Sequence, residues 1–60
     1  MFYIVVLLTV GETPGRLLCQ VAAPRFEDIP PSVVVEGLGT FWLSGAHDEN
    51  GRAVYQERMQ

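Results

Sequence analysis

The sequence contains no lysine, one cysteine (Cys19) and one histidine (His47). Without lysine the chain cannot form a Schiff base or supply the lysine of a phosphate-binding P-loop. A lone cysteine cannot form a disulfide within the chain, and together with one histidine it cannot complete the four ligands of a structural zinc site. We therefore expect no internal disulfide, no metal and no cofactor.

Positive charge is also scarce. Seven acidic residues stand against four arginines, Arg16, Arg25, Arg52 and Arg58, and the net charge is -3. The arginines are spaced singly along the chain, so no basic stripe is available to hold a phosphate backbone. We expect no nucleic-acid partner.

No apolar run reaches the roughly 20 residues that a membrane-spanning helix needs. The longest such run lies within residues 1–10, and nothing basic precedes Arg16, whereas a signal peptide begins with positive charge. We interpret this run as a buried strand and expect no membrane contact. Together with the single cysteine, the lack of a signal-peptide pattern indicates a reducing, cytoplasmic setting.

Residues 2–10 are rich in β-branched and aromatic side chains and are apolar on both faces, which is typical of a strand covered on both sides. The segment at about 14–23 allows two interpretations. It is a strand that returns antiparallel to the first, after a type II turn at Pro14 and Gly15, or a helix that begins near Pro14. Gly15 and the short length count against the helix.

The remaining chain predicts further strands near residues 32–36, 40–46 and 52–58, after a proline-rich connection with one helical turn at 25–29. Phe26 and Ile29 would insert from that turn into the core. The fold class is thus all-β, a single domain over residues 1–60 with a small antiparallel sheet or barrel of four to five strands in hairpins. The alternative is an α+β fold with the helix at about 14–23 packed on a four-stranded antiparallel sheet.

The last hairpin reverses within residues 48–51, and its loop length decides which side chains share a face. A two- or four-residue loop places Trp42 with Tyr55. A three-residue loop with Gly51 in the left-handed region separates polar from apolar side chains more cleanly. It groups Phe41, Leu43, Ala53, Tyr55 and Met59 on one face.

The same hairpin contains the most polar stretch of the chain, around His47, Asp48 and Glu49. Neighbouring side chains of an extended strand point to opposite faces, so these three cannot converge on one ion. We interpret them as a solvated turn with Asp48 and Asn50 bonded to nearby backbone. Cys19 lies among apolar neighbours and is interpreted as a small buried hydrophobe.

Two sets of residues are candidates for contacts with other molecules. Trp42, Arg58 and Arg52 would share an exposed face, and tryptophan and arginine are enriched at binding hot spots. A first strand that is apolar on both faces is difficult to cover within 60 residues, which favours self-association. The predicted oligomer interface consists of Phe2, Ile4, Val6, Tyr3 and Val5.

The leading functional hypothesis is a small non-enzymatic interaction or structural protein that acts as a homo-oligomer. The second is a regulator or inhibitor of another protein, with the acidic surface or Trp42 as the contact. The third is an enzyme whose site forms between subunits, with His47 as the acid or base.

Overall fold

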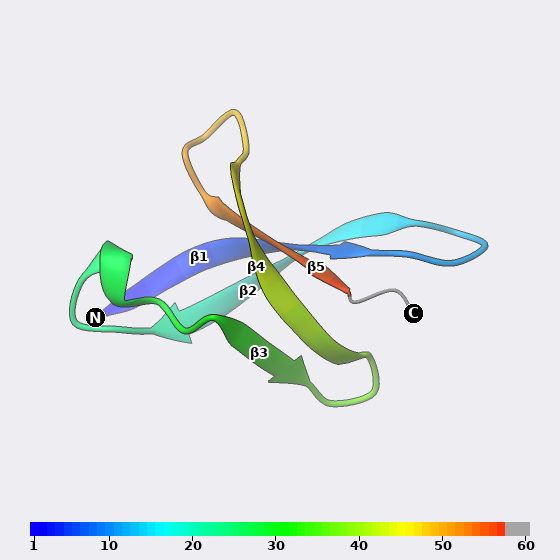
Figure 1. Cartoon of the computed structure of the whole chain (residues 1–60), viewed down its shortest axis with the longest axis horizontal. Coiled ribbons are helices and arrows are strands. Elements are labelled where there is room, and N and C mark those ends of the chain that lie inside the picture. The colour runs from blue at the N-terminus through cyan, green and yellow to red at the C-terminus, as the bar shows by residue number, and fades with distance from the viewer. Residues whose placement is uncertain (58–60) are drawn as a thin grey trace.

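A computed structural model describes residues 1–57, and these form one curled five-stranded sheet (Figure 1). The order across the sheet is β2-β1-β5-β4-β3. The predicted all-β class is confirmed. The elements in chain order are β1 (Phe2–Thr9), β2 (Gly15–Ala22), the 3-10 turn η1 (Phe26–Asp28), β3 (Ser32–Val35), β4 (Gly39–His47) and β5 (Ala53–Glu57).

The segment after β1 is a strand, so the alternative helix at about 14–23 is wrong. β2 runs antiparallel to β1, from Phe2 opposite Ala22 to Thr9 opposite Gly15. A helix would have left the backbone groups on this side of β1 without a neighbouring strand, and such groups need partners when they are buried. The strand supplies those partners along the whole of β1.

The predicted type II turn at Pro14 and Gly15 is also wrong. Gly15 already belongs to β2, and the positive φ of the reversal is at Gly11. The Gly15 amide donates a 2.8 Å hydrogen bond to the hydroxyl of Thr9, which in turn donates to the Gly15 carbonyl at 3.2 Å. The Thr9 side chain thus closes a five-residue reversal over residues 10–14.

The connection between β2 and β3 contains the single short turn η1, close to the predicted helical turn. Phe26 and Ile29 are partly buried and pack against the core, as predicted. Arg25 Nε lies 3.0 Å from Asp28 Oδ2 and ties the turn together at the surface. Within the described part of the chain, no helix has the length and apolarity needed to cross a bilayer.

The β4–β5 hairpin has the three-residue loop 49–51. The Asp48 amide donates to the Arg52 carbonyl at 2.9 Å, and the Gly51 amide donates to the Asp48 carbonyl at 3.0 Å. Gly51 has a φ of 76°, in the region that this loop type requires of its last residue. The loop length that separates apolar from polar side chains is therefore the one that forms.

A bulge in β4 shifts the register of this hairpin. Leu43 pairs with Tyr55 and His47 with Ala53, so four steps along β4 match two along β5. Two extra residues preserve the alternation of faces. Phe41, Leu43, Ala53 and Tyr55 accordingly share one face, which is the grouping that the three-residue alternative predicted; Met59, its fifth member, lies outside the described residues.

One strand pair departs from the predicted antiparallel arrangement. β1 and β5 are parallel, with Val6 opposite Val54 and Leu8 opposite Gln56. The reason is the shape of the connection: β3, β4 and β5 form an antiparallel meander, and its last strand reaches β1 running in the same direction. A parallel pair needs a long crossover, which the segment between β1 and β5 provides.

The core lies on the face that carries the odd-numbered side chains, here called the inner face. Its buried cluster includes Val5, Leu7, Phe41 and Tyr55, while Cys19, Val33 and Val35 pack partly buried against it. The Tyr55 hydroxyl donates a 2.5 Å hydrogen bond to the Pro30 carbonyl and so fixes the connection before β3 to the centre of β5.

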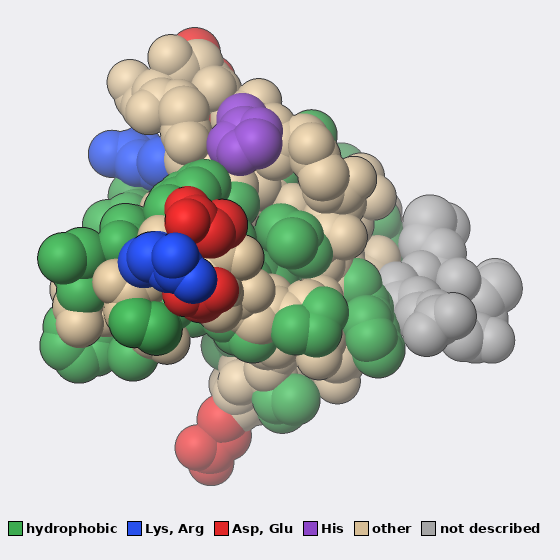
Figure 2. Space-filling view, turned by 60° about the vertical axis from the view of Figure 1, so that its left-hand side comes forward, with side chains coloured by type: hydrophobic (Ala, Val, Ile, Leu, Met, Phe, Trp, Pro, Cys, Tyr) green, Lys and Arg blue, Asp and Glu red, His purple; other side chains and the backbone are tan. Residues whose placement is uncertain are grey.

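The opposite face, here called the outer face, carries the even-numbered side chains of the strands. Val6 and Val54 are buried at its centre, where β1 and β5 have a strand on each side. Toward the sheet margins large apolar side chains are exposed, among them Phe2, Leu18 and Val34. Figure 2, from one side of the molecule, shows many hydrophobic side chains at the surface around one compact group of basic and acidic side chains.

Candidate functional site

Asp48 organises the loop that follows His47. Its Oδ1 accepts hydrogen bonds from the amides of Asn50 at 2.9 Å and Arg52 at 2.8 Å. This confirms the predicted bonding of Asp48 to local backbone. The side chain is only 3% exposed, however, so a fully solvated turn is not what forms.

The second carboxylate oxygen of Asp48, Oδ2, faces two arginines. It lies 3.7 Å from Nη2 of Arg16 and 3.9 Å from Nη1 of Arg52, without a closer hydrogen-bond partner in the described chain. Burial alone would raise the pKa of this carboxyl. The two amide hydrogen bonds and the two positive charges outweigh burial, and the pKa lies below its usual value of 3.8.

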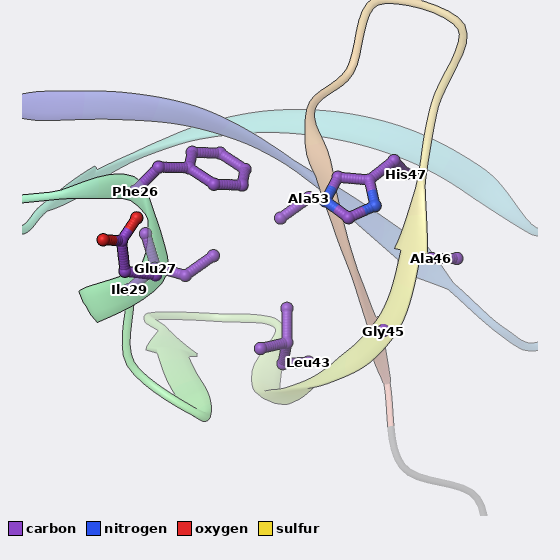
Figure 3. Close-up of a pocket in the computed structure, with 8 residues that line it drawn as sticks. All are labelled: Phe26, Glu27, Ile29, Leu43, Gly45, Ala46, His47 and Ala53. Carbon is purple, nitrogen blue, oxygen red and sulfur yellow. The ribbon is translucent and has the colours of Figure 1, made fainter.

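A small pocket adjoins His47 on the inner side of the molecule (Figure 3). Phe26 and His47 form part of its wall, with ring centroids 5.9 Å apart and planes inclined by 29°. Leu43, Ala53 and the bulge of β4 supply most of the rest. The carboxylate of Glu27, another lining residue, points away from the pocket in Figure 3.

The chemistry available in this pocket is limited. Its volume is about 250 Å³, below the roughly 300 Å³ at which pockets for small organic ligands begin. His47 is the one imidazole, and the Asp48 carboxylate is directed to its own loop and to arginines. Across residues 1–57, no group of three His, Cys, Asp or Glu side chains is placed to hold a metal ion. The pocket is therefore small and lined mainly by apolar side chains.

Cys19 is half-buried on the inner face of β2, where it packs against the core. Its thiol donates a long, 3.6 Å hydrogen bond to the Gln20 carbonyl. The predicted burial is therefore partial, because β2 is one of the two outermost strands and has no neighbouring strand on one side among residues 1–57.

Two of the three residues predicted to bind a partner, Trp42 and Arg52, are described, and they lie apart in the structure. Trp42 is 40% exposed on the outer face, in a row with Gln56 of β5. Arg52 lies four residues back along the chain from Gln56, roughly 13 Å at strand spacing, and reaches toward Asp48. Arg58 lies outside the described residues.

The five residues predicted at an oligomer interface divide into two groups. Val5 and Val6 are buried by their own chain, at 0% and 1% exposure, and cannot contribute surface to a partner. Tyr3 is partly buried and meets Phe26 edge to face, with ring centroids 5.5 Å apart. Phe2 and Ile4 remain exposed on the outer face.

Leu17 and Leu18, in the middle of β2, are exposed apolar residues that the sequence did not single out. They could not be chosen while their segment was compatible with both a helix and a strand. In a helix both leucines would have belonged to the apolar side that packs on the sheet. In an outermost strand, the Leu18 side chain instead lies exposed on the outer face. The sequence feature that could have pointed to them is the length and low charge of the segment, which are unusual for a strand at a sheet edge.

The chain matches no family model, no curated protein and no solved structure, so the geometry is the basis for any functional statement.

Proposed function

We propose that this chain is a small non-enzymatic interaction protein that works as a homo-oligomer. The observation that carries the proposal is the exposed apolar margin of the outer face on β1 and β2. Phe2 and Leu18 are 68% and 63% exposed there, and Arg16 is the single charged residue in the two strands.

The placement of Arg16 supports this proposal. Its guanidinium lies 3.7 Å from both Asp48 Oδ2 and Glu49 Oε2, in a loop of the same chain. In the sheet order β1 and β5 lie between β2 and β4, so the arginine reaches back across its own molecule. The margin of β1 and β2 thus combines apolar area with little charge, which marks a contact surface in a soluble chain.

Size gives a second reason for association. Domains of this length bury a smaller fraction of their surface than larger domains do, and they often gain stability from a partner subunit. An identical chain is the simplest such partner, and a twofold contact uses the same apolar margin on both copies.

Paired serine substitutions test the proposal. Phe2→Ser with Leu18→Ser should weaken self-association about tenfold or more, since each lost apolar contact at an interface centre costs on the order of 1 kcal/mol or more. The dissociation constant is measured by light scattering over a dilution series. Val34→Ser is the matched control, because Val34 is 78% exposed at the other side of the sheet. Equal effects of the control and of the pair would contradict the assignment of the surface.

The enzyme alternative has one supporting observation, the apolar pocket beside His47. It predicts that any activity found for the oligomer disappears in His47→Ala, and an activity that survives this change would contradict it. The regulator alternative stays a prediction for Trp42, to be tested by comparing Trp42→Ala with the wild-type chain in binding to a purified partner.

A further inference from the structure

β2 is one of the two outermost strands of the sheet, and its hydrogen-bonding pattern determines which backbone groups face outward. The Ala23 amide donates to the Met1 carbonyl at 3.0 Å, which continues the β1–β2 register by one pair. In an antiparallel ladder such hydrogen-bonded pairs alternate with pairs whose groups point away. The odd-numbered residues of β2 therefore bond to β1. In Arg16, Leu18, Gln20 and Ala22 the backbone N–H and C=O groups point away from β1, toward the free edge, and these four are here called the outward-facing residues.

This edge has few of the features that usually prevent strand addition, and Arg16 is its one charged residue. It is eight residues long, its register with β1 is unbroken, and it contains no proline, no lysine and no bulge. All four outward-facing residues are exposed. The other edge, β3, has four residues and follows Pro30 and Pro31, so it offers a much shorter template.

A second copy of β2 fits this edge in one best register. Antiparallel pairing must place outward-facing residues opposite each other, so a twofold axis can pass through Leu18, Cys19 or Gln20. The register centred on Cys19 sets Arg16 opposite Ala22 and Leu18 opposite Gln20. All four outward-facing residues of each copy are then used, in four pairs that exchange two hydrogen bonds each, about eight in all.

The flanking prolines disfavour the two neighbouring registers. If the twofold axis passes through Leu18, one of the four hydrogen-bonded pairs is lost and Pro14 lies opposite Ala22. Centring on Gln20 likewise brings Pro24 opposite Arg16. Since proline has no amide hydrogen, neither slipped register can restore the lost pair fully. The register centred on Cys19 also keeps the two Arg16 side chains roughly 20 Å apart, because six residues at strand spacing separate them.

We infer that two copies of this chain join edge to edge through β2, antiparallel, with Cys19 of each copy opposite Cys19 of the other. This inference rests on the proposed homo-oligomer and names its contact. The two sheets become one continuous ten-stranded sheet, in which Leu18 and Phe2 of both copies extend the outer face on either side of the axis.

Cys19 provides a direct probe of this register. At the axis the two cysteines form a pair without mutual hydrogen bonds, whose Cα atoms lie about 4.5 Å apart, inside the range that a disulfide spans. A mild oxidant such as diamide should therefore link them. The two thiols lose two protons and two electrons to diamide, and one S–S bond forms. The association itself does not require this bond.

The first experiment measures the covalent dimer that diamide produces, by mass spectrometry without reductant. Linking within a preformed pair proceeds at a first-order rate independent of protein concentration, and Cys19→Ser abolishes it. A rate that rises in proportion to concentration would mean random collision and would overturn the inference.

The second experiment compares Gln20→Pro with Gln20→Ala by light scattering. The proline removes an outward-facing amide and leaves the β1 ladder intact, as prolines at sheet edges do, so it should convert the dimer to a monomer. Gln20→Ala keeps the amide and should remain dimeric. If Gln20→Pro is as dimeric as the wild type, the edge contact is wrong.

The outcomes separate this inference from the proposed function. A wild-type oligomer that neither links through Cys19 nor responds to Gln20→Pro would keep the homo-oligomer and overturn the β2 contact. A strict wild-type monomer would overturn both. If Gln20→Pro fails to fold, as judged by circular dichroism, the concentration dependence of cross-linking decides alone.

Discussion

Tyr55 and Asp48 are two polar side chains with little exposure, and both use backbone groups as partners. Burial raises the pKa of Tyr55 above 10.0, and repulsion from an ionised Cys19 adds to the effect. The phenol is therefore a neutral donor to Pro30 over the physiological range. Asp48 is the opposite case, since its hydrogen bonds and arginines favour the charged form.

Tyr55→Phe should lower the free energy of unfolding by about 1 kcal/mol, because it removes the hydroxyl that satisfies the Pro30 carbonyl. The measurement is urea denaturation at one fixed protein concentration. Tyr3→Phe is the matched control, since the Tyr3 hydroxyl meets only the Met1 sulfur in an exposed position. A loss as large in Tyr3→Phe would mean that the Pro30 contact has no special role.

Asp48→Asn should flatten the acid limb of the stability curve. The folded pKa of Asp48 lies below the unfolded value of 3.8, so its contribution is present above pH 3.8 and is lost as the pH falls through the folded pKa. Asparagine keeps the acceptor for the amides of Asn50 and Arg52 but does not titrate. Urea unfolding across the acid range measures this.

Glu49→Gln serves as the control for Asp48→Asn, because the Glu49 side chain is 73% exposed and near only one of the same arginines. It should leave the acid limb close to that of the wild type. Identical acid limbs for Asp48→Asn and the wild-type chain would contradict the role given to Asp48.

At the scale of elements, the bulge of β4 determines how β4 and β5 pair beyond their three-residue loop. It holds the two extra residues of β4 between the pair His47–Ala53 and the pair Leu43–Tyr55. Gly45 has a φ of 84° there, and the Ser44 hydroxyl donates to the Val54 carbonyl at 2.7 Å. The bulge also forms one side of the pocket beside His47. Gly45 inside the strand pattern is compatible with a bulge, but the register that the bulge produces depends on the partner strand.

Gly45→Ala should destabilise the chain by about 1–2 kcal/mol, the usual cost of a left-handed conformation for a residue with a Cβ. The added methyl group meets no atom within 4 Å, so the cost comes from the backbone alone. Thermal or urea unfolding measures it. Gly15→Ala is the control: its φ is not positive, its Cβ would lie 3.4 Å from the Thr9 hydroxyl oxygen, and its effect should be smaller.

The elements differ in how far their sequences specify them. β1 was predictable because β-branched and apolar residues continue without a break. The length of the last hairpin loop was left open, because loops of two, three and four residues would all end at Gly51. β2 was ambiguous, since Leu17, Leu18 and Val21 suit both periodicities and only pairing with β1 decides. The parallel β1–β5 contact could not be read locally, because it joins segments at opposite ends of the chain.

The same distinction applies to the candidate site. The bonding of Asp48 to its own loop followed from residue type and position. Its burial did not, because Arg16 approaches it from β2, far away in the sequence. Phe26 was predicted to enter the core, whereas its stacking on His47 required the fold to bring η1 beside β4.

At the scale of the whole molecule, residues 1–57 leave the two edges of the sheet and much of one of its faces uncovered. The inner face is closed by η1 and by the core side chains, while the outer face exposes Phe2 and Leu18 beside the long edge of β2. Under the proposal, self-association at that margin gives partners to the outward-facing backbone groups of β2 and brings Leu18 of each copy beside the other copy. This is the central claim of the functional proposal.

The most direct test is the solution mass of the wild-type chain under reducing conditions, measured by light scattering from the millimolar to the low-micromolar range. The proposal predicts a particle of about 13 kDa, twice the 6.7 kDa of one chain, that dissociates on dilution. A mass of 6.7 kDa at every concentration would contradict it.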